Sequence, residues 1–163
     1  ARTLSHCRQL PGSRVQTLAE SSFAAWHKFY KADENSPNAI VSYYQQGSLA
    51  ALCLDQLIRR NSDNSQSLDT VMRGLYQDWL DSRSGITEGS WQRRAQEILG
   101  QDLASFFQAA LYSTAELPLV EALRHIGVEL RWQPEKSGSP AGGTPRTKTT
   151  GLRSLRSVAE LRS

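Results

Sequence analysis

The strongest pattern of apolar positions in the chain lies in residues 38–60. Apolar residues recur there at steps of three and four, which is helical spacing, and no proline interrupts them. They are Leu49, Leu52, Cys53, Leu57 and Ile58, with Ala50, Ala51 and Leu54 beside them. The apolar surface is therefore wider than a narrow stripe, and we predict a helix that is buried on most sides. Gln45, Gln46, Asp55 and Gln56 are spread along it, which favours a core helix over a membrane-spanning one.

Shorter helical patterns surround this segment. Ser67 and Asp102 are typical N-cap residues, Pro118 suits a first helical turn, and Gly100 suits a C-terminal cap. One short strand is expected in residues 128–132, which alternate in polarity. Helices are expected in residues 1–10, 13–30, 38–60, 67–80, 91–99, 103–112 and 117–126. The predicted fold class is therefore mainly α, a multi-helix, bundle-like subdomain with one short strand and a disordered C-terminal tail.

Several large aromatic side chains fall on the predicted helix faces. Phe23, Trp26 and Tyr30 share one face of the helix expected in residues 13–30, and Val15 and Leu18 are expected to pack beneath it. Residues 67–80 place a second set on one face, namely Val71, Met72, Leu75, Tyr76 and Trp79. The spacing predicts that Trp26, Trp79 and Trp91 are core or half-buried anchors.

The charge balance changes near residue 133. Residues 1–133 carry 13 Lys and Arg against 14 Asp and Glu, a net charge of −1, whereas residues 134–163 carry 6 against 2, a net charge of +4. The latter segment is rich in Pro, Gly, Ser and Thr, and its leucines recur at a helical period too short to be stable alone. We therefore predict a helical subdomain in residues 1–133 and a basic, low-complexity linker or tail in residues 134–163.

This division limits the partners of the subdomain. Because the basicity belongs to the tail, no specific nucleic-acid-binding face is expected on the helices, and no helix is expected to enter a membrane. A weaker hypothesis gives the tail an anionic partner, such as nucleic acid or a membrane surface. The opening residues contain neither an initiator methionine nor an apolar signal core. The compartment is therefore not encoded, and a cytoplasmic location is slightly favoured.

The motifs of common catalytic sites are missing. His6, His27 and His125 have no partners at zinc-site spacing, and neither an H-E-x-x-H nor a C-x-x-C motif occurs. Glu121 and His125 are four residues apart, but such a pair on an amphipathic helix is most often solvated. No serine lies in a G-x-S-x-G turn, and no glycine-rich phosphate loop occurs. We therefore expect no metal ion or other cofactor to be held by this chain.

Three further features favour a structural interpretation. The pairs Arg59–Arg60 and Arg93–Arg94 are interpreted as solvated helix ends and faces. Cys53 lies on the apolar face of residues 38–60, where a free thiol behaves as a small hydrophobe. Tyr43 and Tyr44 are adjacent in the first turns of the same helix, and from the residues alone packing with a satisfied hydroxyl is favoured.

A family resemblance changes the interpretation of the two tyrosines. The specific stretches are PGSRVQTLAESSF at 11–23, DENSPN at 33–38, and VSYY at 41–44 followed by Gly47. Further stretches follow in order: SLDTVMRGL (67–75), DLASFFQAALY (102–112), ELPLVEAL (116–123) and GVELRW (127–132). Over residues 1–133 the chain resembles the post-zinc part of glycyl-aminopeptidase-type gluzincin metallopeptidases, which often carry a C-terminal PDZ domain. The tail beyond Trp132 does not resemble a PDZ domain.

The resemblance implies a helical part that packs beside a zinc-binding catalytic half. In the family the H-E-x-x-H helix and the third ligand lie upstream, so zinc is implied for the full-length parent and not for this chain. Related aminopeptidases carry a Y-x-K-G element whose tyrosine donates to the oxyanion. Residues 44–47 fall on that pattern, which makes Tyr44 the catalytic candidate and Tyr43 a substrate-binding candidate. Gln46 departs from the family pattern, because lysine is usual there.

Two hypotheses for function follow. In the first, the chain is a fragment that forms the helical cleft wall of a zinc-dependent aminopeptidase and is inactive without the zinc-binding half. Its partners would then be that half and a peptide substrate. In the second, the chain is a stand-alone helical interaction module without catalytic activity. An H-E-x-x-H motif upstream would support the enzyme, and a start codon just before Ala1 would support the module.

Overall fold

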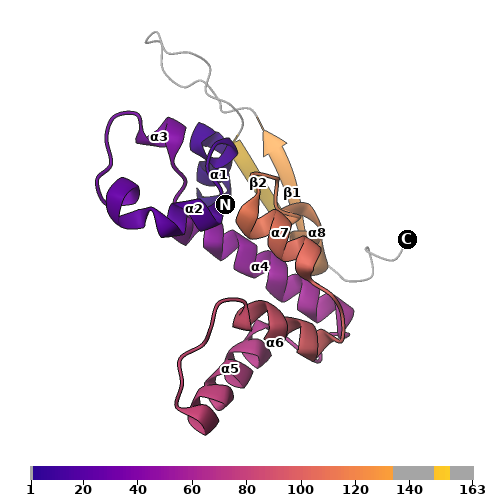
Figure 1. The fold of residues 1–163 in the computed structure, drawn as a ribbon. Helices are drawn as coiled ribbons and strands as arrows, with labels where there is room; N and C mark the ends of the chain where they lie inside the picture. Colours follow the sequence, from indigo (N-terminus) through magenta and orange to yellow (C-terminus); the bar gives the residue numbers. More distant parts are fainter. Residues whose placement is uncertain (1, 134–148, 155–163) are drawn as a thin grey trace.

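The computed structural model describes residues 2–133 and 149–154, and its described part is mainly helical, as predicted (Figure 1). The α-helices are α1 (Arg2–Gln9), α2 (Leu18–Phe23), α3 (Ser36–Ala39), α4 (Tyr43–Asn61), α5 (Leu68–Ser82), α6 (Ser90–Leu99), α7 (Ala104–Tyr112) and α8 (Leu119–His125). Two other helical turns are present, the 3₁₀ helix η1 (Pro11–Arg14) and the π-helix η2 (Ala25–Phe29). The strands are β1 (Val128–Gln133) and β2 (Thr149–Ser154).

Helix α4 runs through the middle of the described part and contributes to every apolar cluster around it (Figure 1). Leu54 and Ile58 pack with residues of α5, α6 and α7. Leu49 packs with residues of α1 and α8, and Ala50 packs between α2 and α7. The helix predicted in residues 38–60 is therefore the core element, although its regular part begins five residues later. The short helix α3 and an extended segment occupy residues 36–42.

The start of α4 is fixed by buried hydrogen bonds. The Val41 amide donates to Gln16 Oε1 at 3.1 Å, and the Ser21 hydroxyl donates to the Val41 carbonyl oxygen at 2.5 Å. All three residues are buried. Ser42 caps the helix, because its hydroxyl oxygen accepts from the Gln45 amide at 3.4 Å. Since a buried polar group without a partner is costly, these bonds define the direction in which the first helical turn leaves the core.

Residues 13–30 do not form the single helix that was predicted. Helix α2 ends at Phe23, Ala24 leaves helical geometry with ψ at 9°, and the chain continues as the π-helix η2. Because the wider π turn changes the angular step between residues, the expected common face is lost. Phe23 is 93% exposed and Trp26 is 76% exposed, while Leu18 and Ala25 are buried instead. The predictions that Trp26 is an anchor and that Val15 packs beneath the helix were therefore wrong.

The predicted apolar face of α5 is only half covered. Val71 and Leu75 are buried in the cluster shared with α4, α6 and α7, and Trp91 packs against that cluster as a partly buried side chain. Met72 and Tyr76 are exposed, and Trp79, predicted to be a core or half-buried anchor, lies outside the core at 40% exposure. Tyr76 and Trp79 stack on each other on the outer side of α5. Five apolar positions span more of the helix circumference than α6 and α4 cover, so the outer ones stay in solvent.

The strand predicted in residues 128–132 is present as β1. It pairs antiparallel with β2, with Val128 opposite Ser154 and Gln133 opposite Thr149. Strand β2 was not predicted, because residues 149–154 lie in the segment interpreted as a tail, whose leucines had a helical and not an alternating period. The rest of that predicted tail, residues 134–148 and 155–163, lies outside the described residues. No helix among the described residues has the length and apolarity that a bilayer crossing requires.

Two glycines allow a matched test of the packing around α4. Gly12 lies in η1 against the chain that leads into α4, and a Cβ added to Gly12 would overlap the Ile40 backbone carbonyl. Gly12→Ala should therefore lower the free energy of unfolding by about 1–3 kcal/mol. Gly47 lies inside α4, and a Cβ there would meet no atom within 4 Å. Gly47→Ala should raise the free energy of unfolding by about 0.5–1 kcal/mol. Urea unfolding of both variants measures this, and equal effects of the two substitutions would contradict the packing described here.

Candidate functional site

Tyr43 and Tyr44 occupy the first turn of α4 and differ in exposure, although their rings lie side by side. Adjacent residues project about 100° apart around a helix. Tyr43 is half-buried and packs against the cluster of Leu18, Ala50 and Ala110, whereas Tyr44 is 61% exposed. Helix α4 therefore carries the Tyr44 phenol on its outer side while the Tyr43 ring is partly held in the core.

A third tyrosine completes the site. Tyr30 follows directly after the π-helix η2, and its hydroxyl oxygen lies 3.0 Å from that of Tyr43 and 3.1 Å from that of Tyr44. These are hydrogen-bonding distances. The sequence does not predict this contact, because Tyr30 lies 13 and 14 residues before its partners and no local spacing relates them. The only local feature of Tyr30 is that it lies in an aromatic-rich segment, and that feature favours packing over a role in a site.

The rings around these hydroxyls form an aromatic cluster, defined here as Trp26, Phe29, Tyr30, Tyr43 and Tyr44. The Tyr43 and Tyr44 ring centroids are 4.2 Å apart, and the Phe29 ring meets Tyr43 nearly edge-on at 5.3 Å. Phe29 also meets Tyr30 edge-on at 5.4 Å, and Trp26 lies 5.2 Å from Tyr30. Aromatic pairs favour such edge-on and tilted arrangements. The cluster therefore orients three hydroxyls toward one another on the surface.

The hydrogen bonds among the tyrosines shift the pKa values of Tyr43 and Tyr44 in opposite directions. The bond to Tyr30, followed by an interaction with Tyr44, raises the pKa of Tyr43 above its ordinary value of 10.0. Hydrogen bonding with Tyr30, and then with Tyr43, lowers the pKa of Tyr44 below 10.0. A phenol that accepts hydrogen bonds is stabilised as the phenolate, whereas one that donates its proton holds it more tightly. The opposite shifts are those expected where Tyr44 accepts and Tyr43 donates.

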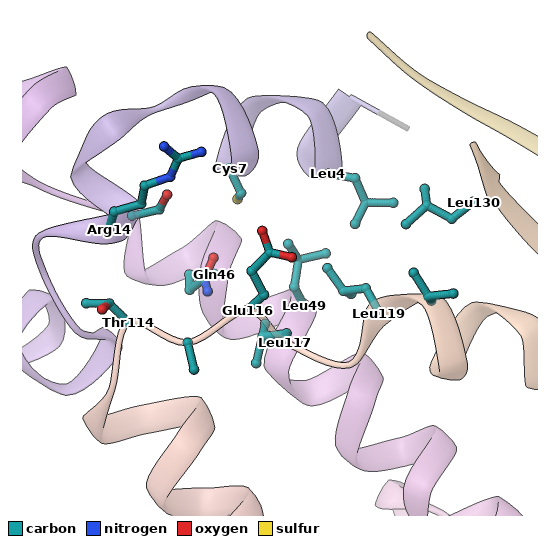
Figure 2. A pocket seen from close by; sticks show the side chains of 13 residues that line it. Leu4, Cys7, Arg14, Gln46, Leu49, Thr114, Glu116, Leu117, Leu119 and Leu130 are labelled. Atoms are coloured by element: carbon teal, nitrogen blue, oxygen red, sulfur yellow. The ribbon is translucent and has the colours of Figure 1, made fainter. Parts of the chain in front are cut away.

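Gln46 lies on the other side of α4 from Tyr44, because residues two apart do not share a helix face. Its side chain lines a separate cavity of about 110 Å³ (Figure 2). Figure 2 shows Glu116 rising from the chain before α8 toward Cys7 of α1, with Arg14 and Thr114 at one end. The apolar part of the cavity is formed by Leu4, Leu49, Leu117, Leu119, Val120 and Leu130. Burial raises the pKa of the Cys7 thiol, so this cavity does not present a reactive thiolate.

The candidate metal pair Glu121 and His125 is held by other contacts. The His125 Nδ1 atom lies 2.9 Å from Gln56 Oε1, and the Glu121 carboxylate lies 3.8 Å from the Arg60 guanidinium. Across residues 2–133 and 149–154, no three His, Cys, Asp or Glu side chains gather into a set that could hold a metal ion. Cys53 is buried as a free thiol, and burial raises its pKa to about 11.

The arginine pairs make contacts within their own surroundings. Arg59 pairs with Asp55 one turn earlier at 2.8 Å, and Arg94 pairs with Asp78 and Glu97. Arg93 donates to the Thr87 and Ser90 hydroxyls at 3.1 Å. These contacts match the interpretation of both pairs as helix ends and faces, so the tyrosines remain the most distinctive polar group on the surface.

Comparison with known proteins gives the family context of this site. The sequence model of the M61 glycyl aminopeptidase family matches residues 1–50, which include the aromatic cluster. The crystal structure of an aminopeptidase N family protein from Idiomarina loihiensis has the same fold over this part, with a TM-score of 0.76 and 36% sequence identity. The match covers 89% of this chain and 25% of that chain, so this chain spans about a quarter of the solved protein. Comparison with curated proteins finds no match.

The two matches agree on the type of protein. They overlap in residues 1–50, and the structural match extends over most of the chain. The chain is therefore similar to part of an aminopeptidase, and in residues 1–50 to the M61 glycyl aminopeptidase family.

Proposed function

We propose that this chain forms the helical wall of the substrate cleft in a zinc-dependent aminopeptidase of the gluzincin type, and that Tyr44 is its catalytic residue. The observation that carries the proposal is the Tyr44 phenol, which is 61% exposed on the first turn of a buried helix. Its position on the Y-x-K-G pattern and the match of the glycyl aminopeptidase family to residues 1–50 support it. The same family match favours this proposal over a stand-alone interaction module.

The chemical role of Tyr44 follows from the course of peptide hydrolysis. When the scissile carbonyl carbon becomes tetrahedral, negative charge develops on the carbonyl oxygen. A phenol fixed beside that oxygen donates a hydrogen bond that strengthens as the charge grows, and it needs no reorientation to do so. Helix α4 meets this requirement, because its start is anchored by the buried bonds of Val41 to Gln16 and Ser21.

We propose a supporting role in substrate binding for Tyr43. Its ring lies against that of Tyr44, and its hydroxyl is 3.0 Å from that of Tyr30. Tyr43 would then contribute ring surface beside the reacting carbonyl while its hydroxyl stays bonded within the cluster. Peptide substrate and the zinc-binding half of the parent are the partners that this arrangement requires.

Zinc would have to be bound outside the described residues of this chain. The described part contains no group of three ligating side chains that fits a metal ion. We propose that the zinc ion is held by the zinc-binding half of the parent, as the family resemblance implies.

The isolated chain should bind no stoichiometric zinc and should hydrolyse no peptide, because the described residues contain no set of metal ligands and the proposed zinc-binding half is a separate part of the parent. Metal analysis after exposure to zinc and dialysis to remove unbound zinc measures the first property. A peptide-release assay on the same sample measures the second. One tightly held zinc ion per chain, or hydrolysis by the chain alone, would overturn the assignment of zinc to another part of the parent.

In the full-length parent enzyme, Tyr44→Phe should lower kcat by about 100- to 1000-fold, or about 3–4 kcal/mol, because one oxyanion donor is lost. KM should change much less, since the bond is made mainly in the transition state. Steady-state kinetics on a peptide substrate measure both constants.

Tyr43→Phe is the matched control for this experiment. It also removes from the first turn of α4 one phenolic hydroxyl that contacts Tyr30, but the Tyr43 ring is half-buried against the core, whereas Tyr44 is 61% exposed. Its effect on kcat should be small. If both substitutions have equally small effects on kcat, the two tyrosines have only a packing role. If kcat falls strongly in Tyr43→Phe alone, the oxyanion donor is Tyr43 and not Tyr44.

A further inference from the structure

Tyr30 touches both tyrosines of the proposed site through a single hydroxyl group. Its oxygen lies 3.0 Å from Tyr43 Oη and 3.1 Å from Tyr44 Oη. We propose that Tyr30 is a positioning residue, whose hydroxyl receives a proton from Tyr43, donates to Tyr44, and leaves the Tyr44 proton free to point outward. This inference rests on the proposed function for its catalytic consequence, but the hydroxyl arrangement itself can be tested without any activity.

The two hydroxyl contacts are compatible with donation in either order, and the proposed role of Tyr44 selects one of them. Each phenol has one O–H proton and can accept at its oxygen. If Tyr44 donated to Tyr30, it would have no proton left for a substrate oxyanion. In the order Tyr43 to Tyr30 to Tyr44, two protons are used inside the cluster and the third stays available. The opposite pKa shifts of Tyr43 and Tyr44 agree with this order, since the donor end is less acidic and the acceptor end more acidic.

The backbone places Tyr30 where this role requires it. The π-helix η2 ends at Phe29, and the Tyr30 amide donates to the Ala25 carbonyl at 3.0 Å, which closes the last π turn. π-Helical turns are rare and occur often at functional sites. The Trp26 and Phe29 rings then hold the Tyr30 ring between them at 5.2 and 5.4 Å. Tyr30 is thus fixed by its own segment, although 52% of its surface is exposed.

Two consequences follow for Tyr44. A hydrogen bond accepted from Tyr30 polarises the Tyr44 O–H group, because bonds in a chain strengthen one another. The same bond limits rotation of the Tyr44 hydroxyl and so keeps its proton on the outer side. Loss of the Tyr30 hydroxyl should therefore weaken Tyr44 as a donor without removing it.

The direct test is the titration of individual tyrosines in the 163-residue chain. Tyrosine labelled with ¹³C at Cζ gives one NMR resonance for each of the five tyrosines, and each resonance shifts as its phenol ionises. In the unsubstituted chain, Tyr44 should titrate below 10.0 and Tyr43 above it. In Tyr30→Phe, which keeps the ring contacts, the pKa of Tyr44 should rise toward 10.0.

Two variants provide the comparison. Tyr43→Phe removes the first donor but leaves the bond from Tyr30, so it should raise the pKa of Tyr44 by less than Tyr30→Phe does. Tyr76→Phe removes an exposed hydroxyl on α5, outside the aromatic cluster, and should leave the titration of Tyr44 unchanged. An unchanged Tyr44 pKa in Tyr30→Phe would overturn the proposal. Equal pKa values of Tyr43 and Tyr44 in the unsubstituted chain would overturn it as well, and that measurement requires no variant to fold.

Kinetics of the parent enzyme separate this proposal from the proposed function. Tyr30→Phe should lower kcat by about 2- to 10-fold, the range expected for one neutral hydrogen bond, and should have no further effect in a Tyr44→Phe background. If Tyr44→Phe leaves kcat unchanged while the titrations follow the predicted order, the catalytic role fails and the hydroxyl arrangement stands. A second outcome is a strong loss of kcat in Tyr44→Phe together with equal effects of Tyr30→Phe on kcat in the unsubstituted and the Tyr44→Phe enzyme. Tyr30 would then not act through Tyr44.

Discussion

The arrangement of the helices depends on two buried hydrogen bonds at the start of α4. They join Val41 to Gln16, in the segment before α2, and to Ser21 in α2. Both backbone groups of Val41 are bonded by buried side chains, the amide to Gln16 and the carbonyl to Ser21. An unbonded polar group at that depth would cost about 1–3 kcal/mol, so α4 cannot shift along its axis or rotate without losing these bonds. The same helix supplies side chains to three apolar clusters, with Leu49, Ala50 and Leu54 in different ones. One anchored helix therefore orients both the core and the tyrosines.

This anchoring explains how an exposed phenol can be held in a fixed direction. Most of the surface of Tyr44 faces solvent, and its ring packs against that of Tyr43. Its position comes from the buried turn beneath it and from the Tyr30 hydroxyl beside it, at 3.1 Å. The departure of Gln46 from the family pattern leaves this arrangement untouched, because the Gln46 side chain lines the cavity beside α1 on the opposite side of the helix. A change at Gln46 therefore alters the surroundings of Cys7 and Glu116 and not those of Tyr44.

The elements that the sequence predicted correctly are those whose signals are local. The apolar period of residues 38–60 and the strand at 128–132 follow from adjacent residues, and Gly100 ends α6 with a positive φ of 63°, as its place in the sequence indicated. The elements that were missed depend on contacts between distant segments. Strand β2 exists by pairing with β1, and Tyr30 reaches Tyr43 and Tyr44 only because a π-helix replaces the expected α-helix. No residue period within 13–30 encodes that change, so the aromatic face was assigned to the core by mistake. The candidate Tyr44 came from the family pattern, and its hydrogen-bond partner came from the structure.

The central claim is that the outer face of α4 supplies a neutral, prepositioned donor to the reacting carbonyl oxygen. A crystal structure of the longer parent enzyme with a phosphinic peptide, a stable mimic of the tetrahedral intermediate, tests it most directly. We expect the Tyr44 hydroxyl to lie about 2.5–3.0 Å from a phosphinyl oxygen. Tyr30 should remain bonded to Tyr44 on the other side. A phosphinyl oxygen bonded by other donors, with the Tyr44 hydroxyl beyond hydrogen-bonding distance, would contradict the account.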